Sequence, residues 1–134
     1  MVVTPSTIYV AGASSEAALV SSYMRRLEAV GWTVVGDWTA QVLAATVPDA
    51  ELSEFDARSI AESCLGHAYR AGWFWFVAPL GGATTTGAWV ELGARAYSDP
   101  RRAIYSGRRI GLFWSLAGHV LDTHDDALRL LGAS

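Results

Sequence analysis

The stretch from Trp73 to Ala78 reads WFWFVA and decides the fold of this chain. It is uniformly apolar, it has the length of a strand, and Gly72 directly before it ends the preceding helical pattern. A strand without polar alternation is typical of a sheet that is covered on both faces. We therefore predict a central, buried strand here.

Strand and helix patterns alternate outward from this segment. Further apolar runs of strand length occupy residues 7–12, 32–36, 109–114 and 119–121, and helical spacing occupies residues 15–30, 48–71, 88–97 and 125–131. Such alternation predicts right-handed crossovers and helices on both faces. We expect one α/β domain over residues 1–134: a three-layer, doubly wound, mostly parallel sheet of four to five strands, flavodoxin-like or Rossmann-like.

Composition excludes several classes of protein. A formal charge of -3 and a pI near 5.5 give no basic footprint for a nucleic acid polymer. The single cysteine allows no intrachain disulfide, the three histidines are not spaced as metal ligands, and no segment resembles a signal peptide or membrane span. The chain also lacks a GxGxxG motif after its first strand and a Walker lysine. We expect a soluble cytoplasmic protein without metal or cofactor.

The fold class also predicts where a ligand binds. In open parallel sheets, ligands lie at the carboxyl ends of the strands, near the point where the strand order reverses. That edge collects the turn at residues 12–15, the loop at residues 79–87 and the start of the helix that carries Glu91. The functional residues are expected there.

Two segments resemble the nucleoside 2-deoxyribosyltransferase family, including its relatives that hydrolyse deoxynucleoside monophosphates. They are TIYVAGA at residues 7–13 and TTGAWVELGARA at residues 85–96. The resemblance implies that Glu91 is the catalytic nucleophile and that Tyr9 holds it. It also implies a small-molecule nucleoside or nucleotide as partner, and a homodimer or higher homo-oligomer.

The chemistry explains why such a family needs a glutamate. An N-glycosidic bond breaks with oxocarbenium character at C1′, and a carboxylate can trap that cation, as in retaining glycosidases. The resulting ester transfers its deoxyribosyl group to a second base in a transferase or to water in a hydrolase. Without the resemblance, Glu91 reads as a solvated helix residue and Tyr9 as a core aromatic.

The loop before Glu91 supplies candidate substrate contacts. By the same resemblance, Thr85 stands where the nucleotide hydrolases carry a phosphate-binding serine. Backbone and hydroxyl donors of this loop could cradle a sugar or phosphate, although a flexible turn explains the same composition. The candidates are Thr84, Thr85, Thr86 and Gly87, with Gly12 from the first turn and Trp89 to stack on the base.

One family feature has no clear counterpart in this chain. Family members carry an aspartate on the preceding helix that binds or protonates the base. An ungapped alignment puts Cys64 at that position, a gapped one puts Asp56 there, and Glu62 is a third candidate. An ordinary thiol is a poor substitute for a carboxylic acid. A non-catalytic nucleotide-binding or sensing domain that retains the fold is therefore the alternative function.

Overall fold

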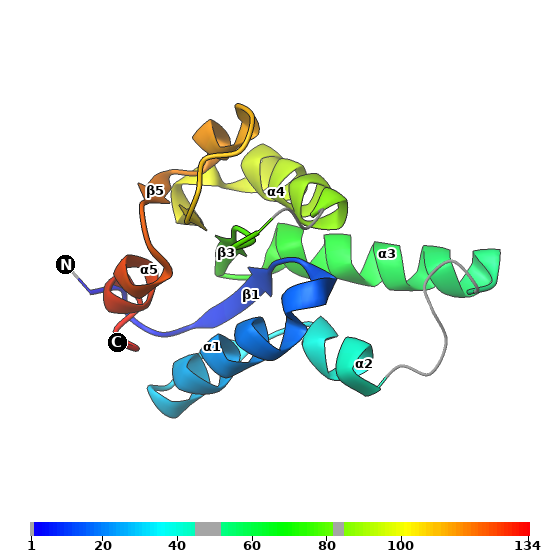
Figure 1. Ribbon diagram of the computed structural model, residues 1–134, viewed down its shortest axis with the longest axis horizontal. Helices are drawn as coiled ribbons and strands as arrows, with labels where there is room; N and C mark the ends of the chain where they lie inside the picture. The colour runs from blue at the N-terminus through cyan, green and yellow to red at the C-terminus, as the bar shows by residue number, and fades with distance from the viewer. Residues whose placement is uncertain (1, 45–51, 82–84) are drawn as a thin grey trace.

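The computed structural model describes residues 2–44, 52–81 and 85–134. Its centre is a five-stranded sheet in which every pair of neighbouring strands is parallel (Figure 1). The strands are β1 (Thr7–Ala11), β2 (Thr33–Val34), β3 (Trp73–Val77), β4 (Ala103–Ser106) and β5 (His119–Leu121). Their order is β2-β1-β3-β4-β5, so WFWFVA does form the middle strand. The strand order reverses between β1 and β3, which is where such sheets bind ligands.

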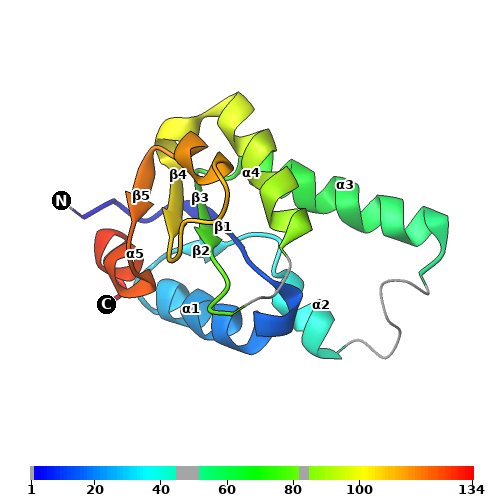
Figure 2. The same ribbon diagram turned by 45° about the horizontal axis from the view of Figure 1, so that its top comes forward.

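Helices cover both faces of this sheet and complete the predicted three layers. They are α1 (Ala17–Ala29), α2 (Trp38–Ala44), α3 (Glu54–Arg70), α4 (Thr86–Ser98) and α5 (His124–Leu130). Figures 1 and 2 show α1 and α5 on one face and α3 and α4 on the other, with α2 beside α1. The α/β, doubly wound prediction is therefore confirmed.

The core consists of two apolar clusters because side chains alternate across each strand. Ile8, Val10 and Trp75 face α1 and α5 and have no exposed surface. Tyr9 and Phe74 belong to the opposite cluster, beneath α3 and α4. Tyr9 alternates with Ile8 and Val10 along β1, so its hydroxyl lies on the α3 and α4 side, where the site described below lies.

The predicted strand at residues 109–114 is wrong. The fourth strand is β4, earlier in the chain, and residues 113–116 form a short 3-10 helix instead. Gly107 and Gly111 adopt positive φ angles of 101° and 67°, which bend the backbone away from the sheet. As a result Leu112 and Phe113 are 66% and 61% exposed, although their apolar character favoured a buried strand.

The helix predicted over residues 48–71 begins later, and a helix before it was not predicted. Ser53 caps α3 by accepting a hydrogen bond from the Asp56 amide at 3.1 Å. Pro48 and Asp49, expected in its first turn, lie outside the described residues. The additional helix α2 starts at Asp37, whose carboxylate accepts hydrogen bonds from the Thr39 and Ala40 amides. Among the described residues, no helix combines the length and apolarity that a membrane crossing requires.

Candidate active site

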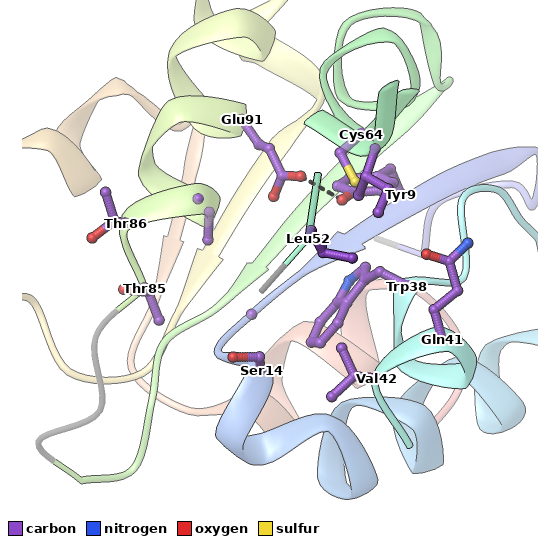
Figure 3. A pocket seen from close by; sticks show the side chains of 14 residues that line it. Tyr9, Ser14, Trp38, Gln41, Val42, Leu52, Cys64, Thr85, Thr86 and Glu91 are labelled. Carbon is purple, nitrogen blue, oxygen red and sulfur yellow. Dashed lines mark hydrogen bonds between the residues drawn. The ribbon is translucent and has the colours of Figure 1, made fainter. Parts of the chain in front are cut away.

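A cavity of about 440 Å³ lies at the carboxyl end of β1 (Figure 3). Strand β1, the turn after it, and helices α2, α3 and α4 all contribute to its walls. The lining residues are Tyr9, Gly12, Ser14, Trp38, Gln41, Val42, Leu52, Ile60, Cys64, Thr85, Thr86, Gly87, Ala88 and Glu91. Segments far apart in the sequence therefore meet at the switch point of the sheet.

Glu91 and Tyr9 form the central contact of the cavity. The Tyr9 hydroxyl donates a hydrogen bond of 2.5 Å to Oε2 of Glu91, which leaves Oε1 available to the cavity (Figure 3). The Tyr9 ring is 1% exposed and stacks between Phe74 and His67, so its position is fixed by packing. Because Tyr9 sits on the sheet and Glu91 on α4, this bond orients the carboxylate across the cavity mouth.

Burial changes the protonation chemistry of this pair. Partial removal from water raises the pKa of the Glu91 carboxyl from 4.5 to about 7, against the Tyr9 hydrogen bond and the nearby Cys64 thiol, which lower it. Burial and, next, the neighbouring Glu91 charge raise the pKa of Tyr9 above its ordinary value. The tyrosine therefore remains a hydrogen-bond donor. A carboxyl that titrates near neutral pH in a cavity is a functional-site signal.

The three candidates for the base-binding position separate clearly. Cys64 lies on the α3 face that looks into the cavity and contacts both Tyr9 and Glu91. Burial, followed by the Glu91 charge, raises the pKa of its thiol. Asp56 is exposed in the first turn of α3, and Glu62 is exposed and pairs with Arg58 at 3.7 Å. Neither carboxylate lines the cavity.

The predicted loop over residues 79–87 ends earlier than expected, because Thr86 and Gly87 already belong to the first turn of α4. Thr85 is 7% exposed, while Thr86 and Gly87 are more open, and all three line the cavity together with Gly12. Thr85 precedes α4 and makes no side-chain cap. The first amides of a helix have no partner within the helix and favour anions, so the start of α4 can contribute donors at this edge of the cavity. Thr84 lies outside the described residues.

Trp89 does not line the cavity. It points toward the sheet, where it packs on Phe76 and Tyr105 with ring centroids 4.5 and 5.7 Å apart. The aromatic wall comes instead from Trp38, whose indole N–H donates to the Val10 carbonyl at 2.6 Å. Sequence reasoning missed Trp38 together with the helix that carries it. The available signal was Asp37 followed by WTAQVLA, which is an N-cap and a helix-forming run.

The arginine of the VELGARA motif has a structural role. Arg95 is 2% exposed and donates hydrogen bonds to the carbonyls of Ala68 and Ala71 at the end of α3. These bonds join α4 to α3, one turn beyond the point where Glu91 faces Cys64. Arg95 therefore fixes the relative position of the two helices that carry the site.

The described residues contain no cluster of three or more histidine, cysteine, aspartate or glutamate side chains that could hold a metal ion. Comparisons of the chain with protein-family models, with curated proteins and with solved structures find no match in any of the three.

Proposed function

We propose that this protein cleaves the N-glycosidic bond of a deoxynucleoside or deoxynucleoside monophosphate, as a transferase or hydrolase similar to the nucleoside 2-deoxyribosyltransferases. The observation that carries the proposal is the Glu91 carboxylate, half-buried in a cavity at the switch point and held by the Tyr9 hydroxyl at 2.5 Å. A positioned carboxylate with one free oxygen is the group that a reaction through an oxocarbenium-like carbon needs.

Each part of the cavity has its own role in the proposed reaction. The free Glu91 oxygen attacks C1′ while Tyr9 keeps the other oxygen in place. The amides at the start of α4, with Thr85 and Thr86, bind sugar hydroxyls or a 5′-phosphate. The base then extends toward Trp38, which offers a ring face. The first step gives a deoxyribosyl ester, and a second base or water completes the reaction.

Chromatography of incubations tests this proposal. The protein is mixed with deoxynucleosides and deoxynucleoside monophosphates, with and without a second free base. Base exchange identifies a transferase, and release without exchange identifies a hydrolase. Glu91→Gln is expected to lower turnover by about a thousandfold while the far-ultraviolet circular dichroism stays unchanged. Unchanged turnover in this variant would remove Glu91 from the mechanism.

A non-catalytic nucleotide-binding or sensing domain is the second candidate. The observation that favours it is Cys64, a thiol at the cavity wall where family enzymes carry a carboxylic acid. This function predicts nucleotide binding by calorimetry with no release of base over days. Saturable binding that Glu91→Gln leaves intact, without turnover in the wild type, would support it.

We further propose that two copies of the chain associate through α3 and α4. A second, mostly apolar groove of about 420 Å³ lies between these helices and shares Cys64 and Glu91 with the cavity. Val90 and Ile60 line it and are 54% and 42% exposed, and the same two helices carry further exposed apolar side chains, Phe55 on α3 and Tyr97 on α4. Light scattering is expected to give the mass of a dimer for the wild type and of a monomer for Val90→Arg. A monomeric wild type would contradict this.

A further inference from the structure

The cavity wall is electrostatically one-sided. Among the described residues, those that line it include one carboxyl group, that of Glu91, and no lysine, arginine or histidine. The remaining segments of the chain, residues 45–51 and 82–84, contain no basic residue either. The basic residue His67 stacks behind Tyr9, with ring centroids 6.4 Å apart, and lines a neighbouring pocket. A positive ligand would therefore meet an uncompensated carboxylate.

Among the described residues, the same wall offers no acid besides Glu91 itself that could protonate a leaving base. The Tyr9 hydroxyl already donates to Glu91, and the raised pKa values of Tyr9 and Cys64 make both weak acids. The Trp38 indole N–H is committed to the Val10 carbonyl. An ordinary neutral base departs as an anion unless it is protonated, which makes its departure slow. A base that already carries a positive charge departs as a neutral molecule and needs no acid.

The geometry of the walls suits such a base. Figure 3 shows Trp38 and Gln41 on one side of the cavity, Thr85 and Thr86 on the other, and Glu91 between the two sides. A sugar bound at the threonine side with its C1′ near Glu91 directs its base toward Trp38. With its N–H committed elsewhere, the indole presents its ring, and an indole ring attracts cations.

We propose that the cavity takes a nucleoside whose base is a cationic, N-substituted heterocycle such as a pyridinium. This inference rests on the proposed function and specifies its substrate class. In the reaction, a Glu91 oxygen forms a bond to C1′ while the C1′–N bond breaks, and its electron pair neutralises the ring. Water then attacks C1′ of the ester, which frees the Glu91 carboxylate and releases one proton to solvent.

The groups around Glu91 determine the expected pH dependence. Tyr9 faces it from β1 and Cys64 from α3, while Arg95, the cation on the same helix, is bonded to α3 carbonyls. Binding of a cation is therefore expected to strengthen as Glu91 ionises near pH 7. His67 lies behind Tyr9, and the Glu91→Gln variant separates its contribution from that of Glu91.

Calorimetry with a matched pair of compounds tests the ligand class. The probes are 1-methylnicotinamide and 1-methyl-1,4-dihydronicotinamide, which have similar shapes and differ by one positive charge. At pH 8 the cation is expected to bind about tenfold more tightly to the wild type, with this preference lost in Glu91→Gln. Equal affinities, or a preference that persists in Glu91→Gln, would overturn the inference.

Turnover is measured separately, with the 2′-deoxyriboside of nicotinamide against deoxyuridine and deoxyinosine. Faster release of nicotinamide supports both the inference and the proposed function. Equal or faster release of the neutral bases overturns the inference and leaves the proposed function standing. Preferential binding of the cation without release of any base supports the ligand class and contradicts the proposed function.

Discussion

Two buried polar clusters lie at the carboxyl ends of the strands, on opposite faces of the sheet, and they differ in what they leave unsatisfied. On one face Tyr9 bonds to Glu91 and one carboxylate oxygen remains free beside a cavity. On the other face Trp75, Ser106 and His124 form a closed chain of hydrogen bonds. The first cluster therefore holds a polar group that is available for chemistry, and the second holds polar groups that stabilise the structure.

The closed chain has a single consistent arrangement of protons. The Ala78 carbonyl can only accept, so His124 donates to it from Nε2 at 3.1 Å. Nδ1 of His124 then accepts from the Ser106 hydroxyl at 2.7 Å, and Ser106 accepts from the Trp75 indole at 2.8 Å. Desolvation lowers the pKa of His124, which agrees with a neutral ring. The network connects α5 to β3 and β4, and every side-chain N–H and O–H in it already has an acceptor.

The largest expected effect comes from opening this closed network. His124→Ala leaves the Ser106 hydroxyl and the Ala78 carbonyl without their partner and removes a ring packed against Tyr23 and Trp75. We expect a loss of about 3 kcal/mol in the free energy of unfolding, measured by urea denaturation. The affinity for cavity ligands should stay within about twofold of the wild type.

His119→Ala is the matched control for that variant. His119 is half-buried beside Trp73, with ring centroids 5.6 Å apart, and the structure gives its side chain no hydrogen bond. Its loss is expected to cost about 1 kcal/mol or less. Similar losses in the two histidine variants would mean that the network adds nothing beyond packing.

The Tyr9–Glu91 pair forms the open cluster, and its carboxylate is expected to lower the free energy of unfolding. The pKa of Glu91 is about 7 in the folded protein and near 4.5 in the unfolded chain, so the folded state binds the proton more tightly. Its contribution is neutral below pH 4.5, becomes unfavourable as the pH rises to 7, and stays constant above. We expect Glu91→Gln to be more stable than the wild type by about 2 kcal/mol at pH 8, with no gain at pH 4.

The difference between the two unfolding free energies is the quantity to measure, because other groups titrate in both proteins. Glu62→Gln is the control, since this side chain is 73% exposed on α3. It should remain within about 0.5 kcal/mol of the wild type at every pH. A pH-independent difference for Glu91→Gln would show that the carboxylate is not desolvated in the folded protein.

How far the sequence predicts this molecule depends on the feature. The central strand, the parallel sheet and the edge that collects Glu91 follow from apolar runs and from alternation. The fourth strand does not, because AIYS at residues 103–106 is shorter and less apolar than RIGLFW at residues 109–114. What decides between them is the tertiary pairing of β4 with β3, from Phe74 to Val77, which no local pattern contains.

The site shows the same division. Tyr9 and Glu91 are 82 positions apart, and local patterns alone predict neither their contact nor its length. Local patterns also do not determine which way each side of a helix faces. Trp89 faces the sheet and Cys64 faces the cavity because α3 and α4 pack on each other in one particular rotation. Arg95 fixes that rotation through α3 carbonyls, and its motif gave no sign of this role.

The smallest expected effect isolates the hydrogen bond within the open cluster. Tyr9→Phe keeps the ring between Phe74 and His67 but removes the donor that lowers the pKa of Glu91. The Glu91 pKa should therefore rise above about 7, and a smaller fraction of the nucleophile is ionised at neutral pH. We expect about a tenfold loss of turnover at pH 7, since a hydrogen bond to a charged group is worth about 1.5 kcal/mol or more.

The pH profile distinguishes this role from simple packing. If Tyr9 acts through the ionisation of Glu91, the rising limb of kcat moves to higher pH in Tyr9→Phe and much of the lost rate returns by pH 9. Tyr105→Phe is the control, because that buried hydroxyl on the same face donates to the Arg108 carbonyl, away from the cavity. A uniform loss at every pH would show that Tyr9 orients the carboxylate without tuning it, and an equal loss in Tyr105→Phe would assign the effect to the fold.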